Sequence, residues 1–230
     1  MRGWIAKFQT LKKNSKAPAS NPVKLRHGAS ILKELKKDYL GAKIALKYGN
    51  NIQLLVAVIL SAQCTDKKVN EVTESLFNKY KSASDFANAN PKVLEKEIHS
   101  CGFYRAKAKS IIESAKKIQK EFGGKVPKTI KEILTLRGVA RKTANVVLGN
   151  AYGVVEGIAV DTHVKRFAGY CGLSTHKDPV KIEHDLMRLF PKKDWFKLTY
   201  MIIDHGRSWR ANKKSHSSCG ICKFCPAFLK

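Results

Sequence analysis

The sequence has 230 residues, and its 44 lysines and arginines stand against 18 aspartates and glutamates, which gives a formal charge of +26 at pH 7. A chain of this length can bury one large core or two small ones. A charge so far from zero indicates a polyanionic partner, with nucleic acid well ahead of a membrane surface. No apolar run reaches the length of a membrane-spanning helix, so we expect a soluble protein.

Residues 1–28 are basic and contain no aspartate or glutamate. Pro18 and Pro22, with serine and asparagine between them, predict a flexible arm. We expect this arm to hold phosphates without reading base sequence. An organelle transit peptide is the alternative for residues 1–16, because such peptides are also basic and acid-free, although this segment has little arginine or serine.

Helical spacing of apolar residues continues from residue 29 almost to the C-terminus, and no stretch alternates as a strand does. The expected class is therefore all-α. The segment that Asn51 would cap is apolar on nearly all faces, so it should lie in the core. The expected helices are 29–47 with a break near Gly41, 52–62, 66–80, 84–99 restarting at Pro91, a basic helix ending at Phe122, a short helix after Pro127, and then 141–151, 162–172, 179–190 and 194–211.

The stretch from Leu136 to Val164 combines two features that favour chemistry. A glycine-containing turn at 137–139 leads directly into an apolar helix, whose first turn carries Arg141 and Lys142. Unpaired amides and the helix dipole favour an anion such as phosphate there. An amine beside another cation at a positive helix end should give up its proton more readily, which suits a nucleophile. The simpler interpretation is that Lys142 is one of many solvated lysines and that Asp161 caps the next helix.

These residues, LRGVARKTANVV followed by VDTHV, resemble the helix-hairpin-helix and aspartate motif of the endonuclease III family of DNA glycosylases. The resemblance covers residues 30–225. The family's hairpin reads Leu-Pro-Gly-Val-Gly, whereas this chain has Arg137 for the proline and Ala140 for the second glycine. Ala140 is expected to make a left-handed backbone costlier at that point. Three further segments agree with the family in order and spacing: LLVAVILSAQCTD (54–66), HSCGFYRAKAKSI (99–111) and IDHGRSW (203–209).

The resemblance implies a helix-hairpin-helix DNA glycosylase fold, in which two helical domains have a DNA-binding cleft between them. Residues 49–158 would form a six-helix barrel domain that contains the hairpin. Residues 29–48 and 159–230 would together form the second domain, which is the iron-sulfur type in this family.

The resemblance also implies a bifunctional DNA glycosylase and AP lyase of base excision repair. Lys142 would attack the sugar of an oxidised pyrimidine nucleotide with the help of Asp161, and the resulting Schiff base would allow β-elimination. Gln63 would fill the space that the damaged base leaves, and Phe103 would act as a wedge in the opposite strand. A polar helix end and a packed core phenylalanine are the alternatives for these two. The other expected DNA contacts are Arg137, Gly138, Val139, Ala140, Arg141 and His163.

Three cysteines near the C-terminus, Cys219, Cys222 and Cys225, follow a C-x2-C-x2-C spacing that indicates a metal site. The other three are scattered singly, which suits a reducing compartment. In the family that the chain resembles, four cysteines hold a [4Fe–4S] cluster, but here the first is missing and the last is displaced. His216 lies at the same spacing upstream, so zinc, an unusual cluster and a metal-free tail all stay open.

Two other classes of function fit the basic charge equally well. One is a non-catalytic helix-hairpin-helix DNA-binding protein, and the other is a zinc-dependent nucleic-acid binding module centred on the cysteine tail. The pair of Lys142 and Asp161 favours the enzyme over both. We expect a monomer that binds double-stranded DNA with damaged bases or abasic sites and does not bind membranes. The expected compartment is a prokaryotic cytoplasm, at the nucleoid, or a nucleus or mitochondrion if the source is eukaryotic.

Overall fold

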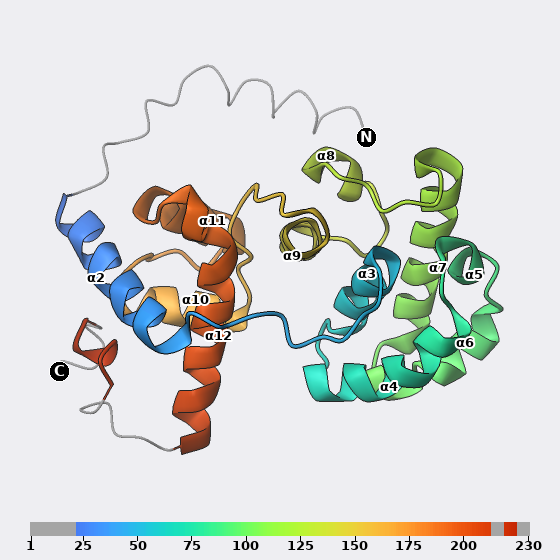
Figure 1. The fold of residues 1–230 in the computed structure, drawn as a ribbon, viewed down its shortest axis with the longest axis horizontal. Coiled ribbons are helices and arrows are strands. Elements are labelled where there is room, and N and C mark those ends of the chain that lie inside the picture. The colour runs from blue at the N-terminus through green and yellow to red at the C-terminus, as the bar shows by residue number, and fades with distance from the viewer. Residues whose placement is uncertain (1–21, 213–218, 225–230) are drawn as a thin grey trace.

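A computed structural model describes residues 22–212 and 219–224, and over these ranges the chain is helical without a strand, which confirms the predicted all-α class (Figure 1). No helix within these ranges is both long and apolar enough to cross a membrane. The α-helices are α2 (Pro22–Tyr39), α3 (Asn51–Leu60), α4 (Asp66–Lys79), α5 (Ala83–Ala87), α6 (Pro91–Glu97), α7 (Tyr104–Phe122), α8 (Ile130–Ile133), α9 (Arg141–Tyr152), α10 (Thr162–Tyr170), α11 (Pro179–Leu189) and α12 (Trp195–Asn212). The 3-10 helices are η1 (His99–Cys101), η2 (Lys192–Asp194) and η4 (Cys222–Phe224).

The first of two hydrophobic cores is formed by residues between Leu46 and Ala159, and it is covered by α3 to α9. Helix α3 lies at its centre, because every residue from Ile52 to Leu60 is buried. That burial is the expected outcome for a helix that is apolar on all sides. Asn50, not Asn51, caps α3, by accepting a hydrogen bond from the Gln53 N–H at 3.0 Å.

The second core combines the two ends of the described chain. It contains Ile31, Leu32 and Leu35 of α2, Ala42 in the segment after α2, and residues between Ile158 and Ile221, most of which lie in α10 to α12. In Figure 1, α2, α10, α11 and α12 lie together on one side and α3 to α8 on the other. Ile44, in the segment that connects α2 with α3, packs against both cores.

The predicted boundaries of the first helix are wrong at both ends. Residues 22–28, which were assigned to the flexible arm, belong to α2, whereas residues 42–47 are not helical. Pro22 suits the start of a helix because the amide it lacks would be unpaired there in any case. His27 and Gly28 hold this turn in place, since His27 Nε2 lies 2.7 Å from the Cys171 carbonyl oxygen and Gly28 packs against α11.

The segment that connects α2 with α3, where the end of the predicted helix was expected, is held by a single side chain of α4, that of Asn70. The Lys47 N–H donates to Asn70 Oδ1 at 2.8 Å, and Asn70 Nδ2 donates to the Ala45 carbonyl at 2.9 Å. An asparagine that both accepts from and donates to the backbone supplies the pairing that a helix would otherwise provide. The connection between the cores is therefore ordered.

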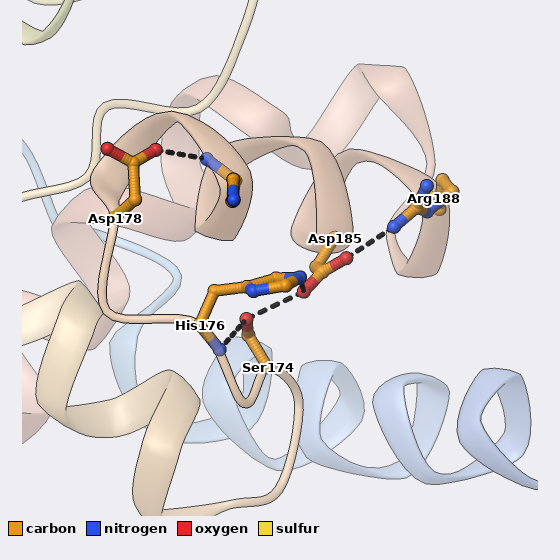
Figure 2. Close-up of polar contacts among 6 residues, drawn as sticks. Ser174, His176, Asp178, Asp185 and Arg188 are labelled. Atoms are coloured by element: carbon orange, nitrogen blue, oxygen red, sulfur yellow. Dashed lines mark hydrogen bonds and ion pairs between the residues drawn. The ribbon is translucent and has the colours of Figure 1, made fainter.

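The loop between α10 and α11 is pinned to α11 by a set of polar contacts (Figure 2). Ser174 Oγ donates to Asp185 Oδ2 at 2.6 Å and accepts from the His176 N–H at 3.2 Å. Asp178 caps the N-terminus of α11. These contacts fix the rotation of α11 about its axis, so that Glu183 points away from them into the interior, where it is 3% exposed.

Candidate active site

The hairpin between α8 and α9 is anchored on α7. Gly138 has φ +76°, and a Cβ at this position would lie 2.8 Å from Ser110 Cβ, so both the backbone and the packing require glycine. Ser114 Oγ donates to the Arg137 carbonyl at 2.8 Å. Arg137, which stands in place of the family's proline, also pairs with Glu113 at 3.0 Å. Because both side chains of that pair are about half exposed, it adds little stability.

Ala140 begins α9 in an extended conformation, with φ −92° and ψ 173°. The expectation that Ala140 would carry the cost of a left-handed backbone is therefore wrong, because the position serves as an N-cap. Its side chain cannot cap the helix, and no other does. From α3 to α11, only α7 and α9 begin without a side-chain cap. The open amides of α9 leave its positive end available to an anion such as phosphate.

Lys142 is the second residue of α9 and is half-buried. Its side chain makes neither a hydrogen bond nor an ion pair with any residue of the described ranges. Arg141 next to it is engaged instead, since its Nε donates to Glu183. The amine of Lys142 is thus left for a reactant, at the end of the helix where the dipole favours an anion.

Asp161 is half-buried and caps α10, because its Oδ1 accepts a hydrogen bond from the Val164 N–H at 2.8 Å. The simpler interpretation of Asp161, that it caps the next helix, is therefore confirmed. The loop before it is held as well, since Thr199 Oγ1 of α12 donates to the Ala159 carbonyl at 3.0 Å. A carboxylate fixed in this way keeps one orientation, which also suits a residue that has to meet a developing charge.

Glu183 connects the helix of Lys142 with the loop that leads to Asp161. Its Oε2 accepts from Arg141 Nε at 2.6 Å, and its Oε1 accepts from Asn145 Nδ2 at 3.0 Å. The same Oε1 lies against Gly157, where a Cβ would approach it to 1.8 Å. Sequence reasoning missed this residue.

Neutralising Glu183 should loosen this connection. We expect Glu183→Gln to lower the free energy of unfolding by about 2 kcal/mol, less than the ~3–5 kcal/mol typical of a broken buried pair because Arg141 is partly exposed and can turn to water. Thermal unfolding followed by circular dichroism measures this. Glu156→Gln is the matched control, since Glu156 is exposed one residue before Gly157 and removes the same charge. Equal stability of the two variants would contradict the role given to Glu183.

Gln63 and Phe103 are both exposed and both strained. They have φ +53° and +47°, and they are the only non-glycine residues with positive φ in the part of the chain that the structure covers. A left-handed conformation at such residues costs on the order of 1–3 kcal/mol and is typical of functional positions. Phe103 is 66% exposed, so the alternative of a packed core phenylalanine is wrong. The insertion of both side chains into DNA stays a prediction.

Two of the motifs that carried the resemblance meet across the cores. Arg207, in the segment IDHGRSW, pairs with Asp66, which ends LLVAVILSAQCTD. Gly206 lies against the ring of His163, whose Nδ1 would be 2.9 Å from a Cβ at that glycine. His163 is half-buried against α12, and its contact with DNA stays a prediction.

The cysteine tail is described in part. Cys219 and Cys222 lie close together, with the Cys222 N–H donating to Cys219 Sγ at 3.4 Å, and η4 packs against α2. His216 and Cys225 lie outside the described residues. Within those residues no three histidine, cysteine or carboxylate side chains form a metal-binding group. A [4Fe–4S] cluster takes four ligands, of which Cys219 and Cys222 would supply two.

The chain is similar to known proteins over most of its length. The model of the HhH-GPD superfamily of base excision DNA repair proteins matches residues 56–192. Endonuclease III of Synechocystis sp. is 48% identical over 205 residues, which are 89% of this chain and 94% of that protein. Endonuclease III of Bacillus subtilis is 43% identical over 186 residues, which are 80% of this chain and 84% of that protein.

A solved structure supports the same relationship. A trapped covalent intermediate of endonuclease III with DNA matches the fold with a TM-score of 0.84 at 37% identity, covering 89% of this chain and 97% of that one. The fold and the sequence identity over most of both chains agree. The chain belongs to the endonuclease III family of the HhH-GPD superfamily of base excision DNA repair proteins.

Proposed function

We propose that the chain removes oxidised pyrimidines from duplex DNA and then cuts the strand, with Lys142 as the nucleophile and Asp161 as the carboxylate that assists it. The chain is a DNA glycosylase and AP lyase of base excision repair, and it binds DNA. The residue assignment rests on one observation: the Lys142 amine, which has no polar partner among the described residues, stands at the open end of α9, and Glu183 joins that end to the loop ahead of Asp161. The substrate class rests on the likeness of the lysine-containing hairpin motif to relatives that act on such bases.

Binding begins with the phosphates. The uncapped amides of α9 and the positive charge of the chain hold the backbone without reading base sequence. Gln63 then takes the space of the damaged base as it turns out of the stack, and Phe103 separates bases on the opposite strand. Their exposure and strained backbones suit side chains that must leave the protein surface and enter the duplex.

Base release follows at the exposed sugar. The neutral amine of Lys142 attacks C1′ as the bond from C1′ to the base breaks, and the base leaves with the electron pair and takes up a proton. Asp161 accepts the proton of the attacking amine and stabilises positive charge on the sugar. Breakage of the bond between C1′ and the ring oxygen then leaves a Schiff base between Lys142 and the opened sugar.

The Schiff base makes the strand cut possible. The imine withdraws electrons from the sugar, so a proton can be taken from C2′, and the 3′ phosphate leaves by β-elimination. The strand is cut 3′ to the lesion. Water then hydrolyses the imine and restores the amine of Lys142.

Borohydride trapping tests the proposal. Borohydride adds hydride to an imine, so the wild-type protein mixed with a duplex that contains one thymine glycol should give a stable protein–DNA product, and peptide mapping should locate the adduct on Lys142. A product with an abasic duplex alone would limit the enzyme to the lyase step. Tight binding without a product on either duplex would support a non-catalytic DNA-binding protein. Loss of DNA binding after chelation, with no product, would support the zinc-dependent module.

A further inference from the structure

The two strained residues Gln63 and Phe103 follow the ends of two short elements that lie side by side. Gln63 comes three residues after the end of α3 at Leu60, and Phe103 comes two residues after the end of η1 at Cys101. The two turns are neighbours: burial raises the pKa of the Cys101 thiol to about 11, and the nearby Cys64 thiol adds to the rise. Any device that fixes the spacing of these turns also fixes the spacing of the two side chains proposed to enter DNA.

The side chain of Lys107 connects the two turns by hydrogen bonds. It lies in the first turns of α7 and is 6% exposed, although it carries an ammonium group. Its Nζ donates to the Leu60 carbonyl at 2.8 Å and to the Cys101 carbonyl at 2.8 Å. Both acceptors stand at the C-terminal end of a helix, where carbonyls lack a helical partner and the dipole favours a cation.

Burying the ammonium group of this lysine costs free energy, and packing alone does not explain why a lysine stands here. Desolvation lowers the pKa of Lys107, which shows that the interior opposes its charge. No carboxylate is among its hydrogen-bond partners, which are both carbonyls. A methionine would fill the same volume without this penalty, so the ammonium is explained by what it connects.

We infer that Lys107 is a positioning residue, which sets the distance and direction of the turns that carry Gln63 and Phe103, so that both side chains enter the duplex together. The inference rests on the proposed function. Lys107 does not touch the substrate. It acts through the two carbonyls, and its removal should affect duplex opening, not the chemistry at Lys142.

Lys107→Met tests the inference, because methionine keeps the volume and removes the donors. We expect release of thymine glycol from duplex DNA to fall about 10- to 100-fold, the loss that a small misplacement of working groups causes. A 2-aminopurine beside the lesion, whose fluorescence rises on unstacking, should lose its signal in parallel. Strand cleavage at an abasic site in single-stranded DNA needs no duplex opening, so it should stay within about 3-fold of wild type, far less than the loss expected from misplaced groups.

Two further variants make the test specific. Lys116→Met is the matched control, because Lys116 is an exposed lysine of the same helix, and it should keep wild-type rates. Lys107→Arg should recover part of the fluorescence signal, since it keeps a charged donor. In a protein that already carries Gln63→Ala and Phe103→Ala, Lys107→Met should lower the duplex rate little further, because its effect passes through those side chains.

The outcomes separate this inference from the proposed function. Wild-type duplex activity and fluorescence in Lys107→Met would overturn the positioning role while leaving the function intact. Equal losses on duplex and single-stranded substrates, with a lower melting temperature, would also overturn it, since they would show a structural role only. If Lys107→Met does not fold, Lys107→Arg is measured in the same fluorescence assay. A signal equal to that of the wild type would count against the inference. A reduced signal in a folded protein would support it. Failure of the wild type to form the trapped product would instead count against the proposed function.

Discussion

Lys142→Gln is expected to abolish the borohydride-trapped product and to slow base release at least about 1,000-fold, because an amide cannot act as the nucleophile. Folding should not change, since the Lys142 side chain makes no hydrogen bond or ion pair within the described residues that the protein would lose. DNA affinity should fall only slightly, with the salt dependence of binding reduced by about one phosphate contact. Single-turnover release of thymine glycol, together with binding isotherms at several salt concentrations, measures both effects.

The control for this variant is Lys165→Gln, which removes the same charge from an exposed position of α10. It should trap and cleave as the wild type does while showing a similar small loss of affinity. A trapped product of undiminished yield in Lys142→Gln would show that another amine forms the Schiff base. In that case the open end of α9 would serve phosphate binding alone.

Asp161→Asn should separate the two roles of the aspartate. Asparagine caps a helix about as well as aspartate, so the free energy of unfolding should change by less than about 0.5 kcal/mol. The variant nevertheless loses the charge that assists Lys142, and we expect the rate of base release to fall about 100- to 1,000-fold, as for the loss of one electrostatic contact to a transition state. Binding of undamaged duplex should tighten, because a negative charge facing a polyanion is gone.

Asp161→Ala completes the comparison. It removes the charge and also the hydrogen bond to the Val164 N–H, so α10 should lose a further ~1 kcal/mol of stability. Thermal unfolding and single-turnover kinetics of the two variants together assign each effect. If Asp161→Asn released the base at the wild-type rate, the aspartate would be a helix cap and nothing more.

The helical class was predictable from the sequence because it depends on local patterns. The apolar run of α3, for example, predicts a buried helix from neighbouring residues alone. The start of α2 was not predictable, since residues 22–28 are held as a helix by contacts such as the one between His27 and Cys171, 144 residues apart. Ala140 was misjudged for a related reason, because its backbone follows from its place as an N-cap.

The supporting residues of the site lay beyond sequence reasoning. Glu183 meets Arg141 across 42 residues, and Lys107 meets Leu60 across 47. In the sequence, Lys107 is one basic residue in a basic helix, and Glu183 sits beside the apolar positions of α11. Nothing local distinguishes either from a solvated surface residue, because only the fold shows that both are buried.

The topology of the two cores also sets an order for folding during synthesis. All residues of the first core lie between Leu46 and Ala159. The apolar face of α2 instead packs against residues that extend to Ile221, near the other end of the chain. At about 5–20 residues per second, a ribosome needs several seconds to add that difference. We expect the part that carries the hairpin and Lys142 to fold on the nascent chain, and α2 to pack only after residues up to Ile221 have been made. We therefore expect newly made protein to form its phosphate-binding surface before the second core packs around Val160 and Val164 and fixes Asp161, and to cut DNA only after that core has formed.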